Sequence, residues 1–387
     1  MNKRKIILLL INIIILEAFV FANDYILISP LANNNVYLLN RDGDTIHKWT
    51  TDFSPGLSVY LMPNGNLLRC ENVKSNSFKA GGAGGRISIY DKDSNLLWYY
   101  ELNDKKHLSH HDVELMPNGN ILIIVWEKKS LAEAIENGLN SQNFKEKEIW
   151  SDYIIEVDPT TNEIVWQWHV WDHLIQDYDN TKDNFGIIWE NTDKININYF
   201  GSKDKVDWIH LNSIDYNQET DQILVSSHSF SEVWLIDHSE ENSGIISRWG
   251  NPEAFDSSIE RELYNQHDGK FLDNGNILIF NNGDRVKQPF SEVIELSNIS
   301  TNPQIVWSYT DKKNFFASNI SGAQRLDNGN TLICDGPSGK IFEVTLEKQV
   351  VWSYTSPFYS KTPNKSINEI FRAEIYDDSY SGIEALL

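Results

Sequence analysis

Apolar and polar residues alternate along most of the chain, and short turns interrupt the alternation at regular intervals. Asn-Gly-Asn turns stand at 64–66, 118–120, 274–276 and 328–330, and a variant turn, NQETDQ, stands at 217–222. Each turn follows an alternating segment and precedes a β-rich one such as NILI or TLIC. Asn-Gly supplies the positive φ values that a tight hairpin turn needs. The pattern therefore predicts a series of β-hairpins.

A second signal is an apolar strand that ends in tryptophan and recurs six times along the chain. The recurring residues are Trp49, Trp98, Trp166, Trp249, Trp307 and Trp352. Each unit reads as strand, turn, strand, loop, strand, short turn and Trp strand, which is one four-stranded blade of a β-propeller. Because the tryptophans recur with the repeat, we interpret them as packing between blades. The sequence thus predicts an all-β, six-bladed β-propeller.

Five of the six predicted blades are continuous in sequence, and the remaining one needs both ends of the chain. The continuous units cover residues 57–100, 111–168, 209–250, 266–309 and 321–354. The N-terminal segments ILISP, VYLLN and TIHKW supply only three strands, and FRAEIYDD at 371–378 can supply the missing innermost strand. Pairing of N-terminal and C-terminal strands in one blade would close the ring and leave no open sheet edge.

The first 22 residues have the pattern of an export signal. A basic start at 3–5 precedes an apolar run, and small residues near Ala22 suit cleavage. The run contains Glu17 and is shorter than the ~20 apolar residues that span a bilayer. We therefore expect a signal peptide over residues 1–22 and a single propeller domain over 23–387, in a periplasmic or secreted protein.

Charge and cysteine content limit the possible partners. The formal net charge is -22, and removal of the signal, with three basic residues and one acidic residue, makes it -24 (-22 - 3 + 1). Such a charge repels phosphate backbones and anionic lipids, which argues against nucleic-acid or membrane partners. Cys70 and Cys334 occupy equivalent positions in blades separated by the closing blade. The sequence predicts two free, largely buried thiols, since a disulfide needs close α carbons.

The long loops gather on one face of the predicted propeller. They are the segments 71–86, 128–148, 169–207 and 251–265, of which 128–148 is helix-like. The connections on the opposite face are short. Long loops at one end of a rigid scaffold are where sites are usually built, so we expect the functional site on this face.

Histidine recurs on that face at one position of the repeat. Counting seven residues back from the first Asn of each turn gives His111, His210 and His267 in three adjacent blades, but other residue types in two further blades. The repeat itself therefore does not require histidine, and the coincidence predicts a convergent site. His228 ends a second strand and reaches the same face.

Two kinds of chemistry fit such a site. Three imidazoles are a common zinc set, although the chain has no HExxH or clustered Cys/His pattern. The other is transfer of an anionic group, in which a neutral imidazole attacks, a protonated imidazole protonates the leaving oxygen, and an amide such as that of Asn212 holds developing charge. Asp112 and Asp268 can support the neighbouring histidines in either case. A non-catalytic, ligand-binding propeller is a third alternative.

Several segments point to one family. They are HHDVELMPNGNIL, WQWHVWDHLIQDYD, DWIHLNSIDYN, RWGNP, QHD followed by GNILIFNNGD, and IFRAEIY. Together they resemble the bacterial arylsulfate sulfotransferases over nearly the whole mature chain. Members of that family are six-bladed propellers that move a sulfuryl group from a phenolic sulfate to another phenol through a sulfo-histidine, without a nucleotide sulfate donor. The resemblance implies an aryl sulfate donor, a phenolic acceptor and no metal or cofactor, and leaves the oligomeric state open.

The resemblance also implies roles for individual residues. His267 would be the nucleophile, His111 the general acid and base at the aryl oxygen, and His210 and Asn212 the ligands of the sulfuryl oxygens. His228 stands where the well-described members have arginine. The charge there would depend on pH, because an imidazole titrates near neutrality and a guanidinium does not.

Further residues near this face have open roles. Arg86 or Arg372 could replace the missing arginine charge, and His173 and Asp177 could line the substrate pocket or anchor the longest loop. Four tryptophans outside the repeat could stack on an aryl group or fill the loop layer; they are Trp126, Trp171, Trp189 and Trp208. The glycine-rich GGAGGR at 81–86 is interpreted as a turn.

Overall fold

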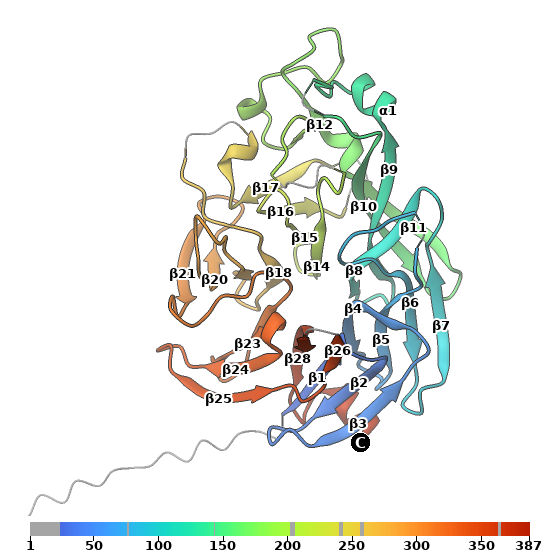
Figure 1. Cartoon of the computed structure of the whole chain (residues 1–387), viewed down its shortest axis with the longest axis vertical. Helices are drawn as coiled ribbons and strands as arrows, with labels where there is room; N and C mark the ends of the chain where they lie inside the picture. Colours follow the sequence, from blue (N-terminus) through green and yellow to red (C-terminus); the bar gives the residue numbers. More distant parts are fainter. Residues whose placement is uncertain are drawn as a thin grey trace, which may run out of the picture.

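Six four-stranded antiparallel sheets form a ring of blades in the described part of the chain (Figure 1). This computed structural model describes residues 24–75, 77–142, 144–201, 206–239, 243–255, 259–362 and 365–387. The predicted all-β, six-bladed propeller is confirmed. The predicted signal peptide, residues 1–22, lies outside the described residues, so the domain boundary at 22/23 stays a prediction.

The blades are numbered here in chain order, and their strands run from the centre of the ring outward. Blade 1 holds β28 (Ile370–Tyr376), β1 (Tyr25–Pro30), β2 (Asn35–Leu39) and β3 (Thr45–Thr50). Blade 2 holds β4 (Ser54–Leu61), β5 (Leu67–Asn72), β6 (Gly85–Tyr90) and β7 (Leu96–Glu101). Blade 3 holds β8 (His107–Leu115), β9 (Ile121–Ser130), β10 (Glu148–Asp158) and β11 (Glu163–His169).

The second half of the ring has the same plan. Blade 4 holds β14 (Leu211–Asn217), β15 (Gln222–Ser227), β16 (Glu232–Asp237) and β17 (Ile245–Trp249). Blade 5 holds β18 (His267–Phe271), β19 (Ile277–Asn281), β20 (Glu292–Ser297) and β21 (Gln304–Tyr309). Blade 6 holds β22 (Gly322–Arg325), β23 (Thr331–Asp335), β24 (Lys340–Val344) and β25 (Val350–Thr355).

The loops add only short elements to this plan. They are α1 (Leu131–Glu136), η1 (Val170–His173), β12 (Leu174–Ile175), η2 (Ile188–Glu190), β13 (Ile195–Asn196), η3 (Pro252–Phe255), η4 (Gly336–Ser338), β26 (Ser360–Thr362), β27 (Lys365–Ile367) and α2 (Ser381–Leu386). Ser130 caps α1 and forms a capping box with Glu133. Among the described residues, no helix is long and apolar enough to cross a membrane.

Blade 1 is built from both ends of the chain, as the sequence predicts. Strand β28 is the innermost strand and pairs antiparallel with β1, with Leu27 opposite Glu374. The central glycines of the Asn-Gly-Asn turns all have the positive φ that these turns require; they are Gly65, Gly119, Gly275 and Gly329. In each turn the side chain of the first Asn also accepts a hydrogen bond from the backbone N–H of the second.

Buried side chains form clusters that each join two neighbouring blades. The recurring tryptophans belong to these clusters or pack against them, so packing between blades is confirmed. Four of them also donate an indole hydrogen bond to the next blade; they are Trp49, Trp98, Trp307 and Trp352. In blade 3 the indole of Trp168 donates such a bond instead, and in blade 4 the hydroxyl of Ser247 donates to the carbonyl of Ile299 in the next blade. Cys70 and Cys334 are buried and free, as predicted.

A closed belt of polar side chains links the six innermost strands. Ser58 donates to the backbone carbonyl of His111 in blade 3, and Arg372 of blade 1 donates to Ser58. The remaining links are Asp112 with Ile214 N–H, Ser213 with Gly269 N–H, Asp268 with Ala323 N–H, and Gln324 with both backbone groups of Ile375. Each link satisfies polar groups that the ring buries at its centre, and so fixes each blade relative to the next.

Candidate active site

Four histidines from three adjacent blades form a row where the innermost strands begin. The ring centroids are 4.6 Å apart for His111 and His210, 5.0 Å for His210 and His228, and 5.4 Å for His228 and His267. His210 and His228 are partly exposed, whereas His111 and His267 are 3% and 4% exposed. The structure thus brings together the four histidines that the sequence places on one face.

A left-handed backbone turn places these side chains. His111 and His210 both have φ of 55°, which costs a non-glycine residue about 1 kcal/mol or more. Leu57 and Ser321, at the equivalent positions of two other blades, also have positive φ, so the turn belongs to the repeat. In blade 5 the turn falls on Asp268, one residue later than the count predicts. The repeat therefore supplies the backbone turn, and the residue type supplies the chemistry.

Asn282 fixes the tautomer of His267. Nδ1 of His267 lies 2.7 Å from Oδ1 of Asn282 and 3.1 Å from the carbonyl of Asn265, and both oxygens are acceptors. The amide group of Asn282 donates to the carbonyls of Ala317 and Ile320, which orients its oxygen toward the ring. Nδ1 must therefore carry the proton, and Nε2 presents its lone pair. Burial lowers the pKa of His267 to about 4, against the opposing hydrogen bond from Asn282.

The glycine-rich loop fits closely over His111. The carbonyl of Gly82 accepts a hydrogen bond from the His111 N–H. A Cβ at Gly82 would lie 1.8 Å from Cε1 of His111, and its φ is +85°. Burial and the neighbouring histidines hold the pKa of His111 well below its ordinary value, so the ring is neutral near pH 7. The segment predicted as a simple turn therefore packs directly on the site.

His210 differs from its neighbours because it faces a carboxylate. Its Nδ1 makes a hydrogen bond with Oδ2 of Asp207. Repulsion from His210 contributes to the lowered pKa of His111, His228 and His267. The row therefore combines one imidazole beside an acid with three neutral ones.

His228 does not behave as the sequence suggests. We expected an imidazole that titrates near neutrality, but burial, with repulsion from His210 and His267, lowers its pKa well below the ordinary value. It is neutral near pH 7 and offers a hydrogen bond in place of a charge. The positive charge of Arg261 also lowers the pKa of His228. Its guanidinium donates a hydrogen bond to Ser231 in the turn that follows His228.

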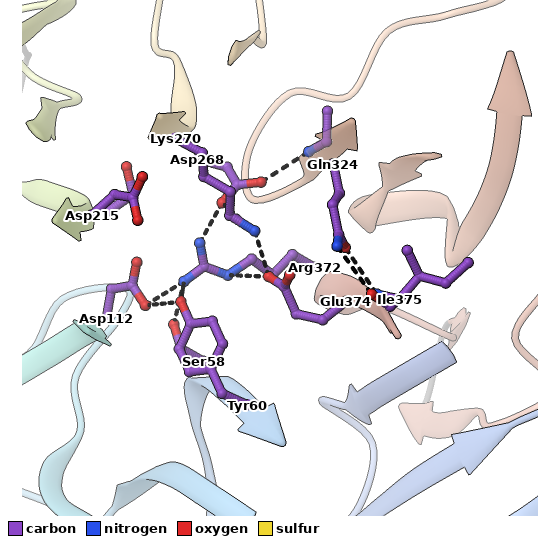
Figure 2. Close-up of polar contacts among 12 residues, drawn as sticks. Ser58, Tyr60, Asp112, Asp215, Asp268, Lys270, Gln324, Arg372, Glu374 and Ile375 are labelled. Carbon is purple, nitrogen blue, oxygen red and sulfur yellow. Dashed lines mark hydrogen bonds and ion pairs between the residues drawn. The ribbon is translucent and has the colours of Figure 1, made fainter. Parts of the chain in front are cut away.

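Arg372 lies beneath the row and connects the strands that carry His111 and His267. Figure 2 shows its guanidinium between Asp112 and Asp268, the residues that follow these two histidines. Burial alone would lower its pKa, but Asp112, Tyr60 and Asp268 raise it above its usual range. Its charge is thus compensated by carboxylates and is not free for an anionic substrate. Arg86 is also engaged, with Ser88 and Glu71 in blade 2.

The central channel opens on the opposite face as a cavity of about 890 Å³. Its lining includes Pro63, Asn274 and Asp327, which belong to the short hairpin turns of that face. Glu114 and Asp215 also line it, and burial raises the pKa of Asp215 to about 6. This cavity and the histidine row therefore lie at different ends of the channel.

The remaining predicted site residues make contacts within the fold. Asn212 is buried and donates to the carbonyl of Gln266, the residue before His267, so one of its N–H groups is already used. His173 stacks on Trp168 of the outermost strand β11, with centroids 4.8 Å apart, and has no ring contact with the row among the described residues. Trp126 and Trp208 are fully buried, which favours loop filling over stacking on a substrate.

The described residues contain no group of three or more His, Cys, Asp or Glu side chains placed to hold a metal ion. The four histidines of the row follow one another, with centroids of consecutive rings 4.6 to 5.4 Å apart. The row, with neutral imidazoles at His111, His228 and His267, fits the anion-transfer chemistry.

Comparison with protein families shows which family the chain belongs to. Residues 59–357 match the arylsulfotransferase (ASST) family. The chain belongs to this family. The match covers all four histidines of the row, and ends before Arg372 and the closing strand β28.

A solved structure shares the fold of this chain at low sequence identity. A protein of unknown function from Bacteroides caccae has a TM-score of 0.53 and 15% identity, over 91% of this chain and 98% of that one. A putative 6-phosphogluconolactonase from Bacteroides fragilis has a TM-score of 0.47 and 9% identity, over 93% and 99%. No curated protein sequence matches the chain.

Sequence reasoning missed several residues that support the row. Asn282, Asp207 and Gly82 were not assigned roles, and His110 was passed over beside His111. Two signals were available: the doublet HHD, and the paired asparagines in IFNNGD after the blade 5 hairpin. Asp207 lies three residues before His210 and His110 directly precedes His111, whereas Gly82 contacts His111 from a different blade, and no spacing along the chain reveals that contact.

Proposed function

We propose that this protein moves a sulfuryl group from an aryl sulfate to a phenol through a covalent intermediate on Nε2 of His267. The family supports sulfuryl transfer on small aryl substrates in general. The observation that carries the covalent route is the fixed tautomer of His267, whose Nδ1 proton is held by Asn282 and Asn265. A neutral imidazole with a free lone pair is the form that can attack sulfur.

The first half of the reaction transfers the sulfuryl group to the enzyme. The Nε2 lone pair of His267 attacks the sulfur, an N–S bond forms, and the bond between sulfur and the aryl oxygen breaks. His111 donates a proton to the departing oxygen, as general acid. His210, with Asp207 behind it, and His228 lie between these two residues and hold the sulfuryl oxygens.

The second half reverses these roles with a different phenol. His111 removes the proton from the acceptor hydroxyl, the phenolic oxygen attacks the sulfur, and the N–S bond to His267 breaks. Both histidines return to their starting forms. Asn212 contributes by holding the carbonyl of Gln266 and hence the backbone next to His267. We assign no role in binding to His173, which lies against Trp168.

We place this reaction outside the cytoplasm, in the periplasm or the medium. The support is the export pattern of residues 1–22. The donor and the acceptor would both be small phenolic compounds. Their rings would enter from the face that carries the long loops.

Intact-mass spectrometry after brief exposure to 4-nitrophenyl sulfate tests the proposal. The protein is kept at alkaline pH, because a sulfo-histidine is acid-labile. We expect a gain of one sulfuryl group in the wild type and in His47→Ala, a histidine of the outer strand β3, but none in His267→Ala. An adduct that persists in His267→Ala would move the nucleophile elsewhere. No adduct and no released phenol from folded wild type would refute sulfuryl transfer by this route.

A further inference from the structure

His110 is buried behind the row and has no part in the steps above. Its Nδ1 lies 2.8 Å from Nδ1 of His111, and its Nε2 lies 2.8 Å from Oδ1 of Asp152. Its ring stacks on Trp126, with centroids 4.0 Å apart and planes 9° from parallel. Asp152, His110 and His111 thus form a line from the interior to the histidine row.

The contact between the two histidines admits only one proton. A neutral imidazole has one donor and one acceptor nitrogen, so one Nδ1 donates and the other accepts. If His110 donates, the proton of His111 is on Nε2, which is then an acid. If His111 donates, its Nε2 has a free lone pair and is a base. The direction of this single hydrogen bond therefore sets the chemistry that His111 presents.

Asp152 can set that direction, because its carboxyl group lies 2.8 Å from Nε2 of His110 and burial favours the form that carries a proton. Burial raises its pKa well above the ordinary value and Asp207 adds to this, against the backbone N–H groups of Leu211 and His210. Glu127 acts in the same direction as Asp207. Protonated Asp152 can donate to Nε2 of His110, whereas ionised Asp152 can only accept from it. The contact is close but not collinear, so the carboxyl group must turn toward the ring before a proton passes.

We propose that Asp152 and His110 are positioning residues that form a proton relay and switch His111 between general acid and general base; this inference rests on the sulfuryl transfer proposed above. In the acid state, protons lie on Asp152, on Nδ1 of His110 and on Nε2 of His111. The Nε2 proton moves to the departing aryl oxygen. Nδ1 of His111 then takes the proton of His110, and Nε2 of His110 takes that of Asp152.

Both rings remain neutral through this transfer, and the negative charge ends on Asp152. One proton leaves the line of three residues, so its charge changes from 0 to -1. When the acceptor phenol gives its proton to Nε2 of His111, the same shifts run in reverse and restore the starting state. The relay thus explains how an imidazole that is neutral near pH 7 can act as an acid without first becoming a cation.

The dependence of the rate on the leaving group tests the relay. His110→Phe retains a ring against Trp126 but removes both nitrogens. For 4-nitrophenyl sulfate, whose phenol is acidic and leaves unaided, we expect little change in kcat/KM for the donor, which reports only the first half of the reaction. For phenyl sulfate, whose phenol resembles the tyrosine side chain with a pKa of about 10, we expect kcat/KM to fall by ~10²- to 10⁴-fold.

Two further variants separate the relay from a structural effect. Asp152→Asn retains the shape of the side chain but cannot release a proton, and we expect the same stronger dependence on the leaving group. The control is His107→Phe in the same strand β8, where a partly exposed histidine lies 3.1 Å from Asp104; its rates should match the wild type for every substrate.

The outcomes distinguish the relay from the proposed function. In one outcome the wild type forms the adduct, and the rates of His110→Phe and Asp152→Asn depend on the leaving group as the wild-type rate does. The relay is then wrong and sulfuryl transfer stands. If the wild type neither forms the adduct nor releases phenol, sulfuryl transfer fails. The contact between His110 and His111 is then tested by ¹⁵N NMR, in which the ring nitrogen signals of His111 should change in His110→Phe and not in His107→Phe. Unchanged signals would overturn it.

Discussion

Replacing Asn282 by Asp should raise the pH at which His267 is protonated. In the wild type this pKa is about 4, and Oδ1 of Asn282 lies 2.7 Å from Nδ1. A carboxylate there would place a negative charge about 4 Å from the centre of the imidazolium charge, and an effective dielectric constant of ~20 gives an attraction of ~4 kcal/mol. That corresponds to ~3 pKa units, and nearby opposite charges shift pKa values by ~1 to 3 units. We expect the pKa of His267 in Asn282→Asp between about 5 and 7.

The pH profile of kcat/KM for 4-nitrophenyl sulfate measures this change, because it reports the free enzyme. The nucleophile must be neutral, so activity is lost as the pH falls through the pKa of His267. The wild type should remain active below pH 6, whereas Asn282→Asp should lose activity between about pH 7 and 5. Circular dichroism at each pH separates protonation from unfolding. An acid limb at the same pH in both proteins would refute the link between Asn282 and His267.

Two further substitutions test the packing around the row. Gly82→Ala should lower kcat by ~10²-fold, because its Cβ would displace the His111 ring by about 1 Å or more. Gly81→Ala, with no heavy atom within 4 Å of its Cβ, should leave kcat unchanged in the same steady-state assay. Equal rates in the two variants would contradict the close packing of Gly82 on His111. Arg372→Met leaves Asp112 and Asp268 without their shared cation and should lower the free energy of unfolding by about 3 to 5 kcal/mol in urea denaturation. Arg325→Met removes a more exposed ion pair with Glu295 and should cost less; a similar loss in both would be evidence against the central role of Arg372.

The fold could be predicted from the sequence because each blade repeats local signals. The Asn-Gly-Asn turns require a positive φ that glycine adopts, and alternating strands show which residues face a neighbouring blade. The closing strand β28 was predictable since one blade lacked a strand. The side-chain hydrogen bonds to the next blade show the limit of this approach: in blades 3 and 4 they come from the Trp168 indole and the Ser247 hydroxyl, each two residues away from the predicted tryptophan. Small shifts of register of this kind leave no trace in a repeat pattern.

The histidine row was predictable in position but not in electrostatics. Counting from the turns placed His111, His210 and His267 together because the innermost strands of a propeller converge. The pKa of His228 was misjudged, because burial depends on the loops that cover the residue. Asn282, which fixes the His267 tautomer, follows the neighbouring strand β19 of the same blade. Its amide is oriented by the carbonyls of Ala317 and Ile320 in the connection to blade 6, which the pattern of a single blade does not reveal.

The closing blade has a consequence for the order of folding. Arg372 contacts Ser58, a residue 314 positions earlier in the chain. Bringing two points so far apart together costs about 5 kcal/mol of chain entropy, which only the last contacts to form can offset. The ring therefore cannot close on a partly synthesised chain, and contacts this distant in sequence favour slow folding. Until its final strand is present the chain remains an open arc, with the two ends of the belt apart and Asp112 and Asp268 without the arginine that joins them.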